Sequence, residues 1–374
     1  MVCRFWFAAA LFHAAFLGAC LILVRRWLQG EHDPRRWRAS LATVALCLIV
    51  VAVLLASLAA LVGPPGGFTV LRFLAQTLFG ETPLLGVLLS VFLFAHGSQR
   101  SAACVAVAVL ALLGVYVEAY HREPTDLHVR THAVHLGRLP KVVRLLHTSD
   151  IQAFQVGSYE ERVVAEAIAQ GPDLIVITGD FVQPRLSPTR SSTNSDLRPL
   201  LGRLAAAAPL GAYAIRGDVD VDWPKVLDGT GIRPLSGESL RVALPGNRSL
   251  VLVGLTPGMS RGNEQRALVQ LLRQAPGADV RIVLGHNPNF VANLVDSGLT
   301  ADLILAGHTH GGQVVLPFFG PPYTKTKLPR RYASGLQDYG GLALHVSAGV
   351  GMERGAAPQV RFLCPPEICL LELY

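Results

Sequence analysis

The pattern of apolar positions divides this chain into two parts near residue 121. The first part carries long apolar runs, and a helix needs about 20 apolar residues to cross a bilayer. Three runs approach or exceed that length, at residues 5–24, 39–61 and 102–120. A fourth run, 70–96, contains Arg72 and Glu81 and is uninterrupted only from Pro83 onward. The pattern predicts an N-terminal bundle of about four transmembrane helices within residues 1–120.

The first apolar run has a second interpretation, a cleavable signal peptide, because Arg4 precedes it and small residues occur near Cys20. The run continues through Val24 into two arginines, however, and further apolar runs follow. We therefore expect a retained helix.

After residue 140 the apolar runs are short and alternate with segments of helical spacing. Amphipathic helices are predicted at 160–170, 197–207 and 264–274, and buried strands at 211–215 and 280–284. A later region with runs at 341–346 and 367–373 predicts a second sheet. We expect an α/β sandwich of two sheets flanked by helices over residues 141–374.

Two polar segments interrupt this pattern. Residues 121–140 read as a linker whose histidines lack flanking apolar runs. We therefore expect a solvated connector or a first edge strand there, and we do not expect these histidines to belong to the metal site formed by the later motifs. These histidines are His121, His128, His132 and His135. Residues 183–199 are rich in Ser, Thr, Pro and Arg, which predicts a mobile loop.

Residues that bind metals follow several of the short apolar runs. Asp150, Asp180, His286 and the pair His308 and His310 each come directly after such a run. Because ligands of open α/β sheets bind at the carboxyl ends of the strands, we expect these side chains to form one cluster. Two histidines one residue apart on an extended chain can face the same small volume.

These motifs resemble those of the calcineurin-like metallophosphoesterases. Asp150, Gly179-Asp180, Gly285-His286 and Gly307-His308-Thr309-His310 follow the order and approximate spacing of that family, over roughly residues 144–374. The resemblance is greatest to its membrane-anchored bacterial branch. It implies a site with two divalent metal ions, which lower the pKa of bound water and stabilise the entering and leaving oxygens of a phosphate ester.

The resemblance also implies a role for each motif residue. Asp180 would bridge the two ions and act as a catalytic residue. Asp150 and His310 would bind the first ion, and His286 and His308 would bind the second.

Two positions depart from the family pattern. Gln152 stands where the family has a histidine in its first motif, and Gly217-Asp218-Val219-Asp220 stands where the family has Gly-Asn-His followed by Asp or Glu. Gln152 can still offer an oxygen to the first ion, and Asp218 can bind the second ion as a further catalytic residue. Of the candidate metals Mn, Mg, Fe and Zn, this oxygen-rich set favours Mn or Mg.

Val219 is the more serious departure, because the resemblance implies that the histidine it replaces protonates or stabilises the leaving group. General acid catalysis is typically worth about 10²–10⁴-fold. We therefore expect a slow enzyme, or one that needs good leaving groups. Asp220 and Asp222 are candidate substitutes.

Composition and charge agree with a membrane protein. The chain is 51% hydrophobic and only 16% charged, with a formal net charge of +7. It lacks both aromatic-interleaved basic clusters and zinc-finger spacing, so we expect contacts with membrane lipids and no nucleic acid. Only Cys364 and Cys369 of its six cysteines follow residue 140, and a disulfide between them would be strained in extended chain.

The arginines predict orientation in the cytoplasmic (inner) membrane. The first connecting loop contains Arg25, Arg26 and Arg35, whereas the second, residues 63–67, is uncharged, which places the first loop in the cytoplasm. Four crossings put the soluble domain outside the cytoplasm, and three would leave it inside. The run at 70–96 decides between them.

The sequence thus predicts a membrane-anchored, metal-dependent phosphoesterase that acts on a phosphate mono- or diester, with a lipid-linked ester as one candidate. The alternative is a catalytically impaired sensor that keeps the fold and binds metal or phospholipid.

Overall fold

In the computed structural model, the chain forms two compact units. Residues 1–121 with 354–359 form one, and residues 122–353 with 360–374 form the other. The structure describes residues 2–29, 33, 37, 71–137, 139–183, 189–221, 223–354 and 357–374.

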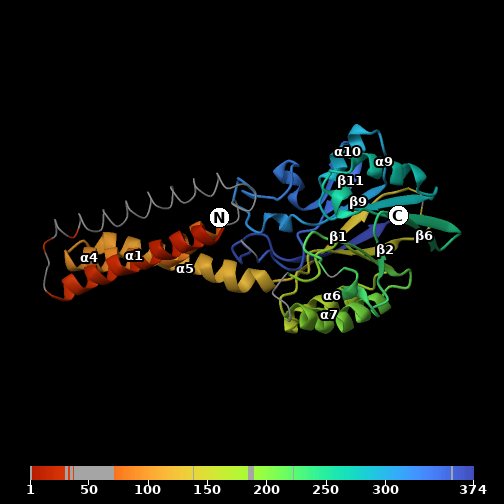
Figure 1. The fold of residues 1–374 in the computed structure, drawn as a ribbon. Helices are drawn as coiled ribbons and strands as arrows, with labels where there is room; N and C mark the ends of the chain where they lie inside the picture. Colours follow the sequence, from red (N-terminus) through yellow and green to blue (C-terminus); the bar gives the residue numbers. More distant parts are fainter. Residues whose placement is uncertain are drawn as a thin grey trace. The chain divides into compact units, whose positions relative to one another are not determined.

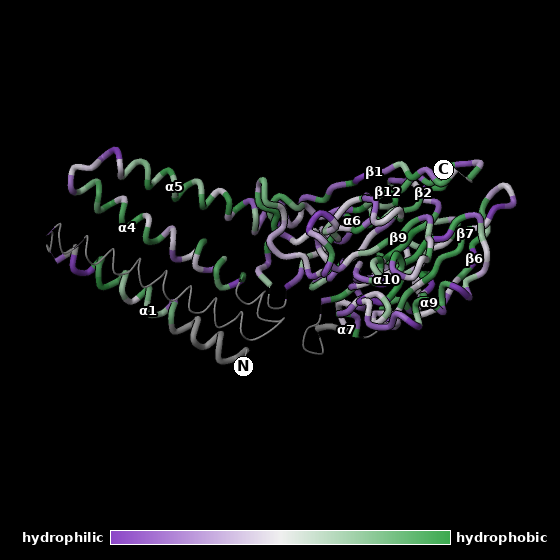
Figure 2. Tube along the Cα trace, turned by 90° about the horizontal axis from the view of Figure 1, so that it is seen from above, coloured by the Kyte–Doolittle hydropathy of each residue, from purple (hydrophilic) through white to green (hydrophobic). Residues whose placement is uncertain are grey.

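The first unit is helical. Its described helices are α1 (Val2–Leu28), α4 (Thr82–Ala95) and α5 (Gln99–Val117), and the π-helical turn Thr77–Glu81 leads into α4. Two continuous helices, Leu71–Ala95 and Gln99–Thr125, are long and apolar enough to cross a membrane. Figure 2 shows that hydrophobic residues predominate along α4 and α5.

The predicted runs fall on these helices, except for one. Residues 5–24 lie in α1, 102–120 begin in α5, and 70–96 coincide with Leu71–Ala95. The run at 39–61 lies outside the described residues. One of the two charged residues in 70–96 is accommodated locally, because the Glu81 side chain is buried and contacts the His13 ring of α1.

The second unit contains two six-stranded sheets. The first has the order β1-β12-β2-β3-β4-β5 and the second β10-β11-β9-β8-β7-β6. The strands of the first sheet are β1 (His128–Val134), β12 (Glu367–Leu373), β2 (Val143–Thr148), β3 (Leu174–Ile177), β4 (Ala212–Ile215) and β5 (Arg233–Leu235). Those of the second are β10 (Gly335–Tyr339), β11 (Leu342–Val346), β9 (Leu303–Ala306), β8 (Val280–Leu284), β7 (Arg248–Gly254) and β6 (Glu238–Leu244).

Helices cover the outer faces of both sheets. α6 (Ser158–Ala169) and α7 (Thr189–Ala206) pack on the first sheet, and α9 (Gln265–Gln274) and α10 (Phe290–Asp296) pack on the second (Figure 1). Short helical turns lie at Lys225–Leu227, Pro257–Ser260, His310–Gly312 and Arg330–Ala333. A third apolar cluster fills the space between the sheets. The predicted two-sheet sandwich flanked by helices is confirmed.

The parallel strands are short and apolar because both of their faces are covered. All four residues of β3 and of β9 are buried. β2, β3, β4 and β5 run parallel, as do β7, β8 and β9. Their carboxyl ends therefore meet at one edge of each sheet.

Three sequence-based expectations need correction or refinement. Residues 367–373 form β12, which belongs to the first sheet between β1 and β2, not to the second. Residues 189–199 are helical, because α7 begins at Thr189 and buries Leu197 and the leucines after it against the first sheet. In the predicted linker, β1 is an edge strand that pairs in parallel with β12.

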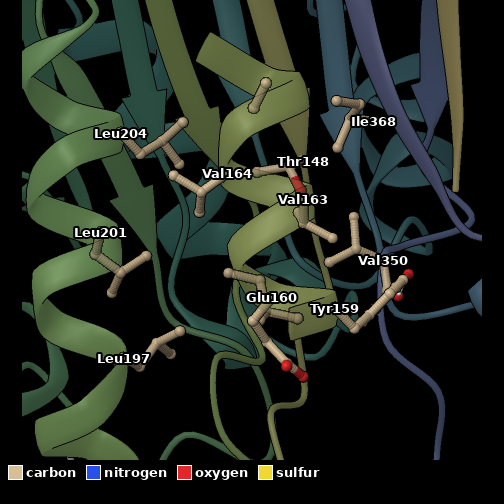
Figure 3. A pocket seen from close by; sticks show the side chains of 12 residues that line it. Thr148, Tyr159, Glu160, Val163, Val164, Leu197, Leu201, Leu204, Val350 and Ile368 are labelled. Carbon is tan, nitrogen blue, oxygen red and sulfur yellow. Dashed lines mark hydrogen bonds between the residues drawn. The ribbon is translucent and has the colours of Figure 1, made fainter. Parts of the chain in front are cut away.

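An apolar cavity lies between α6, α7 and the first sheet (Figure 3). Leucine and valine side chains such as Val163, Leu201 and Leu204 line it. The carboxylate of Glu160 at its rim accepts a hydrogen bond from the Gly157 N–H and caps α6. This cavity is a gap in the packing between the helices and the sheet, and none of the predicted metal ligands lines it.

Candidate metal centre

The predicted metal ligands follow strands of both sheets. Asp150 and Gln152 follow β2, Asp180 follows β3, Asp218 follows β4, His286 follows β8, and His308 and His310 follow β9. Their side chains approach one another across the two sheets. The structure brings all of the predicted residues into one cluster.

The backbone bends sharply at most of these positions. Five of them have φ in the left-handed region: Asp150 (51°), Gln152 (39°), Asp180 (60°), His308 (69°) and His310 (50°). Such conformations are uncommon for residues other than glycine and cost of order 1 kcal/mol or more. Their concentration here indicates that the surrounding structure holds the side chains in fixed directions.

Two glycines let the strand ends approach closely. A Cβ atom on Gly217 would collide with the carboxylate of Asp180, and one on Gly307 would collide with the side chains of Ser149 and Asp150. At each of these two positions, only a residue without a side chain leaves room for the neighbouring carboxylate.

One half of the cluster consists of Asp218, His286 and His308. Asp218 Oδ1 lies 3.1 Å from His286 Nε2 and 3.4 Å from His308 Nδ1, and the two ring nitrogens are 3.3 Å apart. The ring of His286 is fixed from behind, since its Nδ1 lies 2.7 Å from the Thr178 carbonyl oxygen. A hydrogen bond of this kind orients a histidine that binds metal through its other nitrogen.

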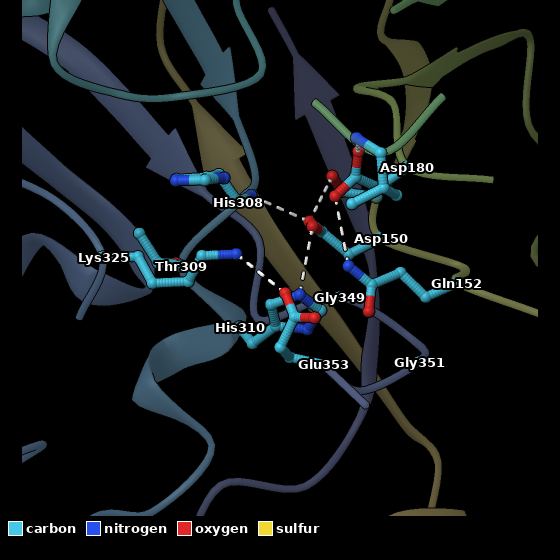
Figure 4. A network of polar contacts seen from close by, with 12 residues as sticks. Asp150, Gln152, Asp180, His308, Thr309, His310, Lys325, Gly349, Gly351 and Glu353 are labelled. Atoms are coloured by element: carbon cyan, nitrogen blue, oxygen red, sulfur yellow. Dashed lines mark hydrogen bonds and ion pairs between the residues drawn. The ribbon is translucent and has the colours of Figure 1, made fainter. Parts of the chain in front are cut away.

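The other half is built around Asp150 (Figure 4). Asp150 Oδ1 lies 3.3 Å from His310 Nε2, while its Oδ2 accepts hydrogen bonds from the Ser149 hydroxyl at 2.6 Å and the His308 N–H at 2.9 Å. Both side chains are almost completely buried.

Asp180 lies between the two halves. Its Oδ2 is 3.3 Å from His286 Nε2 and accepts a hydrogen bond from Gln152 Nε2 at 3.1 Å. Its Oδ1 accepts a hydrogen bond from the Val219 N–H at 3.0 Å. Asp180 thus has the central position that a carboxylate shared by two ions needs.

The unpaired atoms of the cluster fit a bound cation. Within the described part of the chain, neither ring nitrogen of His310 has a hydrogen-bond partner, and Asp150 Oδ1 has none. Buried polar atoms are normally hydrogen-bonded, because leaving one unpaired costs about 1–3 kcal/mol. Two groups of three residues each place their ligand atoms within 4.8 Å of one another. The first group is Asp150, Asp180 and His286, and the second is Asp218, His286 and His308.

The charges of the cluster are strongly coupled. Burial raises the pKa of Asp150 to about 6, a rise that His286 opposes and the nearby Asp180 charge reinforces. Burial also opposes ionisation of Asp218, but hydrogen bonds with His286 and His308 outweigh it and hold the pKa of Asp218 well below its usual range. Burial lowers the pKa of His310, which keeps that ring neutral and able to bind metal.

Asp220 has a structural position. It accepts hydrogen bonds at 2.8 Å from the N–H groups of Asp180, Phe181 and Gly217, so it ties the strand ends together. Burial and the neighbouring Asp180 raise its pKa to about 7, although these N–H groups favour its charged form. The expectation that Asp220 substitutes for a leaving-group acid is not supported by this geometry, and Asp222 lies outside the described residues.

Lys325 is a charged residue beside this cluster that the sequence pattern did not reveal. Its ammonium group pairs with Glu353 at 2.9 Å (Figure 4). Burial opposes the charge of Lys325, but Glu353, Asp218 and Asp180 together raise its pKa above the usual range. Both residues lie in irregular segments without a motif, so only folding brings them to the site.

Cys364 and Cys369 are free thiols in the structure. The Cys364 thiol lies 3.4 Å from the His310 carbonyl oxygen, and Cys369 lies within β12. The strained disulfide that the sequence allows does not form.

Comparison with known proteins agrees with these motifs. The family model for calcineurin-like phosphoesterases matches residues 143–312. The phosphodiesterase YaeI of Escherichia coli is 33% identical over 219 residues, which cover 56% of this chain and 73% of that protein. The uncharacterized metallophosphoesterase YkuE of Bacillus subtilis is 26% identical and covers 72% of this chain, with 93% of its own length matched.

A transmembrane protein with a metallophosphoesterase domain, from Danio rerio, is 28% identical over 61% of this chain and 55% of its own length. Among solved structures, a dimetal phosphatase from Danio rerio matches 56% of this chain and 88% of its own, at 11% identity and a TM-score of 0.33. The Escherichia coli phosphoesterase YfcE matches 58% and 85%, at 17% identity and a TM-score of 0.30.

Proposed function

Since the chain belongs to the calcineurin-like phosphoesterase family, we propose that it is a membrane-anchored phosphoesterase that uses two divalent metal ions. The observation that carries this proposal is the position of Asp180 between two groups of ligand atoms, one around Asp150 and His310 and the other around Asp218, His286 and His308. This arrangement matches a site for two ions that share one carboxylate.

In this proposal, Asp150, Gln152, Asp180 and His310 hold the first ion, and Asp180, Asp218, His286 and His308 hold the second. When bound, the ions lower the pKa of a water molecule and stabilise charge on the phosphate oxygens. The ligand set contains more oxygen donors than nitrogen donors, which favours Mn²⁺ or Mg²⁺ over Zn²⁺.

The site residues named here offer no proton for a leaving group, which limits the esters that the site would cleave quickly. Val219 offers only an N–H group, which is already bonded to Asp180, so it has no proton to give. Lys325 stays charged because of its acidic neighbours, and it therefore acts as a fixed positive charge for phosphate oxygens and not as a proton donor. We expect esters with good leaving groups to react fastest.

The helices of the first unit support an anchor. Leu71–Ala95 and Gln99–Thr125 are long enough to span a bilayer and expose large apolar side chains such as Val87, Phe94 and Leu110. With four spans in the cytoplasmic membrane, the phosphoesterase domain, which we assign to residues 141–374 after a linker at 121–140, would face outside the cytoplasm. A lipid-linked phosphate ester is then a candidate substrate, because the anchor would keep the domain attached to the membrane.

Hydrolysis assays test this proposal. The full-length chain in detergent should hydrolyse nitrophenyl phosphate mono- or diesters with Mn²⁺ or Mg²⁺ and lose this activity after chelation. Asp180→Asn should lower kcat/KM by at least about 10²-fold, because it removes a charge from the centre of the site. The matched control Asp296→Asn, on an exposed residue at the end of α10, should leave it unchanged. Activity that survives both chelation and Asp180→Asn would refute the proposal.

The second candidate, a catalytically impaired sensor that binds metal or phospholipid, is favoured by Val219 beside Asp180. It predicts that the native chain binds metal without hydrolysing these esters with Mn, Mg, Fe or Zn, and that Val219→His confers hydrolysis. Native activity that Asp180→Asn abolishes would exclude it.

A further inference from the structure

A second group of metal-binding side chains lies between the two sheets. His132 of β1, Cys369 of β12 and His345 of β11 place one ligand atom each within 4.8 Å of one another. β1 and β12 belong to the first sheet and β11 to the second. The group therefore joins the two sheets, and none of its members belongs to the predicted ligands at the strand ends.

Strand register explains why these side chains point inward. Cys369 pairs with His147 of β2, and both lie on the face that also carries Leu145 and Leu371 of the inter-sheet core. His132 lies two residues before the buried Val134 on β1, so it shares that face. On the opposite sheet, His345 pairs with Leu305, which also belongs to the inter-sheet core.

The two histidines of this group have nitrogen atoms without hydrogen bonds. Among the described residues, neither His345 Nε2 nor His132 Nε2 has a partner, although both atoms are buried. The His345 side chain is completely inaccessible to solvent. A buried acceptor nitrogen without a donor is unfavourable, and a cation would satisfy it.

The other side of His345 is fixed in the way that metal-binding histidines usually are. His345 Nδ1 lies 2.8 Å from His147 Nδ1, and His147 Nε2 lies 3.0 Å from the Thr178 hydroxyl oxygen. If His147 donates from Nε2 to Thr178, its Nδ1 accepts the N–H of His345. His345 Nε2, which is buried without a hydrogen-bond partner among the described residues, then carries the lone pair and is the ring atom that can bind an ion.

We propose that His132, His345 and Cys369 bind one transition-metal ion, of the Zn²⁺ class, that is distinct from the ions of the strand-end site. Two imidazoles and a thiolate suit Zn²⁺ or Co²⁺ and not Mg²⁺ or Ca²⁺. On binding, the Cys369 thiol releases its proton to solvent and its sulfur becomes bonded to the ion. Water at the sheet edge completes the coordination.

Small side-chain movements suffice for this site. Ligand atoms around a tetrahedral Zn²⁺ ion are roughly 3.3–3.8 Å apart for bonds of about 2.0–2.3 Å. The atoms here are within 4.8 Å, and His132 lies on an edge strand and is partly exposed, so its ring can turn toward the other two. Such an ion would tie β1, β12 and β11 together.

The site is also connected to the strand-end cluster. Thr178, whose hydroxyl contacts His147, holds the His286 ring through its carbonyl oxygen. A chain of contacts therefore runs from His345 through His147 and Thr178 to His286. An ion on His345 would stabilise the orientation of His286 without contacting the substrate.

The proposal is tested by adding Co²⁺ to the full-length chain in detergent after treatment with a chelator. Only a thiolate bound to Co²⁺ gives a sulfur-to-cobalt charge-transfer band in the near ultraviolet. We expect this band together with one more equivalent of bound Co²⁺ than the strand-end site takes up. Cys369→Ser and His132→Ala should each remove the band and that equivalent, while Cys364→Ser should keep both. His132 is on an edge strand, so its variant should fold, which circular dichroism checks.

Absence of the band in the folded native chain would overturn the proposal. A band that is unchanged in the folded Cys369→Ser and His132→Ala variants would also overturn it. So would a band that disappears only in Cys364→Ser.

Discussion

At the residue scale, the chemistry of the site depends on what Val219 lacks. Its backbone N–H holds Asp180, but its isopropyl side chain can neither donate a proton nor bind an ion. The carboxylate of the next residue, Asp220, is fully used in holding backbone N–H groups, so it does not replace the missing acid. Under the proposed function, the site would still bind metal and polarise a phosphate, but it would give the leaving group no proton.

We predict that Val219→His raises kcat for alkyl phosphate esters by about 10²-fold, the lower end of what a general acid contributes. Nitrophenyl esters should change much less, because nitrophenolate leaves without a proton. Val221→His is the control, since Val221 is 62% exposed in the same loop. An equal effect on both ester types, or the same gain from Val221→His, would contradict this explanation.

A second residue-scale prediction concerns pH. Burial lowers the pKa of His147 to about 3, so this ring stays neutral in the folded chain. The unfolded chain binds that proton below about pH 6.5, and the folded chain does not. The free energy of unfolding should therefore fall as the pH decreases from about 6.5 toward 3. Above about pH 6.5, His147 is neutral in both states and does not change the free energy of unfolding.

The effect of this single group between pH 7 and pH 5 is about 2 kcal/mol. His147→Gln, which cannot be protonated, should flatten the pH dependence by that amount in unfolding experiments on the metal-free chain. Identical pH dependence in the two proteins would show that His147 titrates normally.

Most of the candidate site could be predicted from local sequence, and part of it could not. Short apolar runs that end in Asp or His mark strand ends, and this pattern alone indicated Asp150, Asp180, His286, His308 and His310 as neighbours. Lys325 and Glu353 lie in irregular segments, and their position depends on loops that no periodic pattern predicts. The group around His345 could not be predicted either, for a different reason: its residues lie on regular strands, but these strands are far apart in the sequence and meet only in the fold.

At the scale of elements, apolar periodicity predicts where the helices and parallel strands lie in the sequence. It does not predict which strands pair with one another. The segment that becomes β12 reads as a strand, but its place beside β2 is set by packing between distant parts of the chain. α7 includes a polar start that reads as a loop, and its leucines on the first sheet hold it in a helix. Tertiary packing overrides local propensity in both cases.

The strand that precedes Asp150, β2, should be sensitive to loss of packing. Leu145 lies on β2, is completely buried and belongs to the cluster between the sheets. Leu145→Ala should reduce the free energy of unfolding by about 2–5 kcal/mol, which urea unfolding measures. Val142→Ala, on a side chain that is 51% exposed just before the same strand, should change it by less than about 0.5 kcal/mol. Equal effects would contradict the assigned core.

At the scale of the whole molecule, composition separates the chain into two kinds of structure. The apolar first unit exposes large hydrophobic side chains along its helices, as lipid-facing helices do, and the second unit buries them between sheets and helices. Two polar side chains in the apolar part, His13 and Glu81, contact each other between α1 and the π-helical turn that precedes α4. The charge in the run at 70–96 is therefore compatible with a span.

The central claim is that strand ends from two sheets hold two ions around Asp180. Anomalous X-ray diffraction from crystals of the Mn²⁺-loaded full-length chain tests it most directly. We predict two manganese peaks about 3.5–4 Å apart, one beside Asp150 and His310, the other beside Asp218, His286 and His308, with Asp180 between them. A single peak, or no peak at these side chains, would contradict the claim.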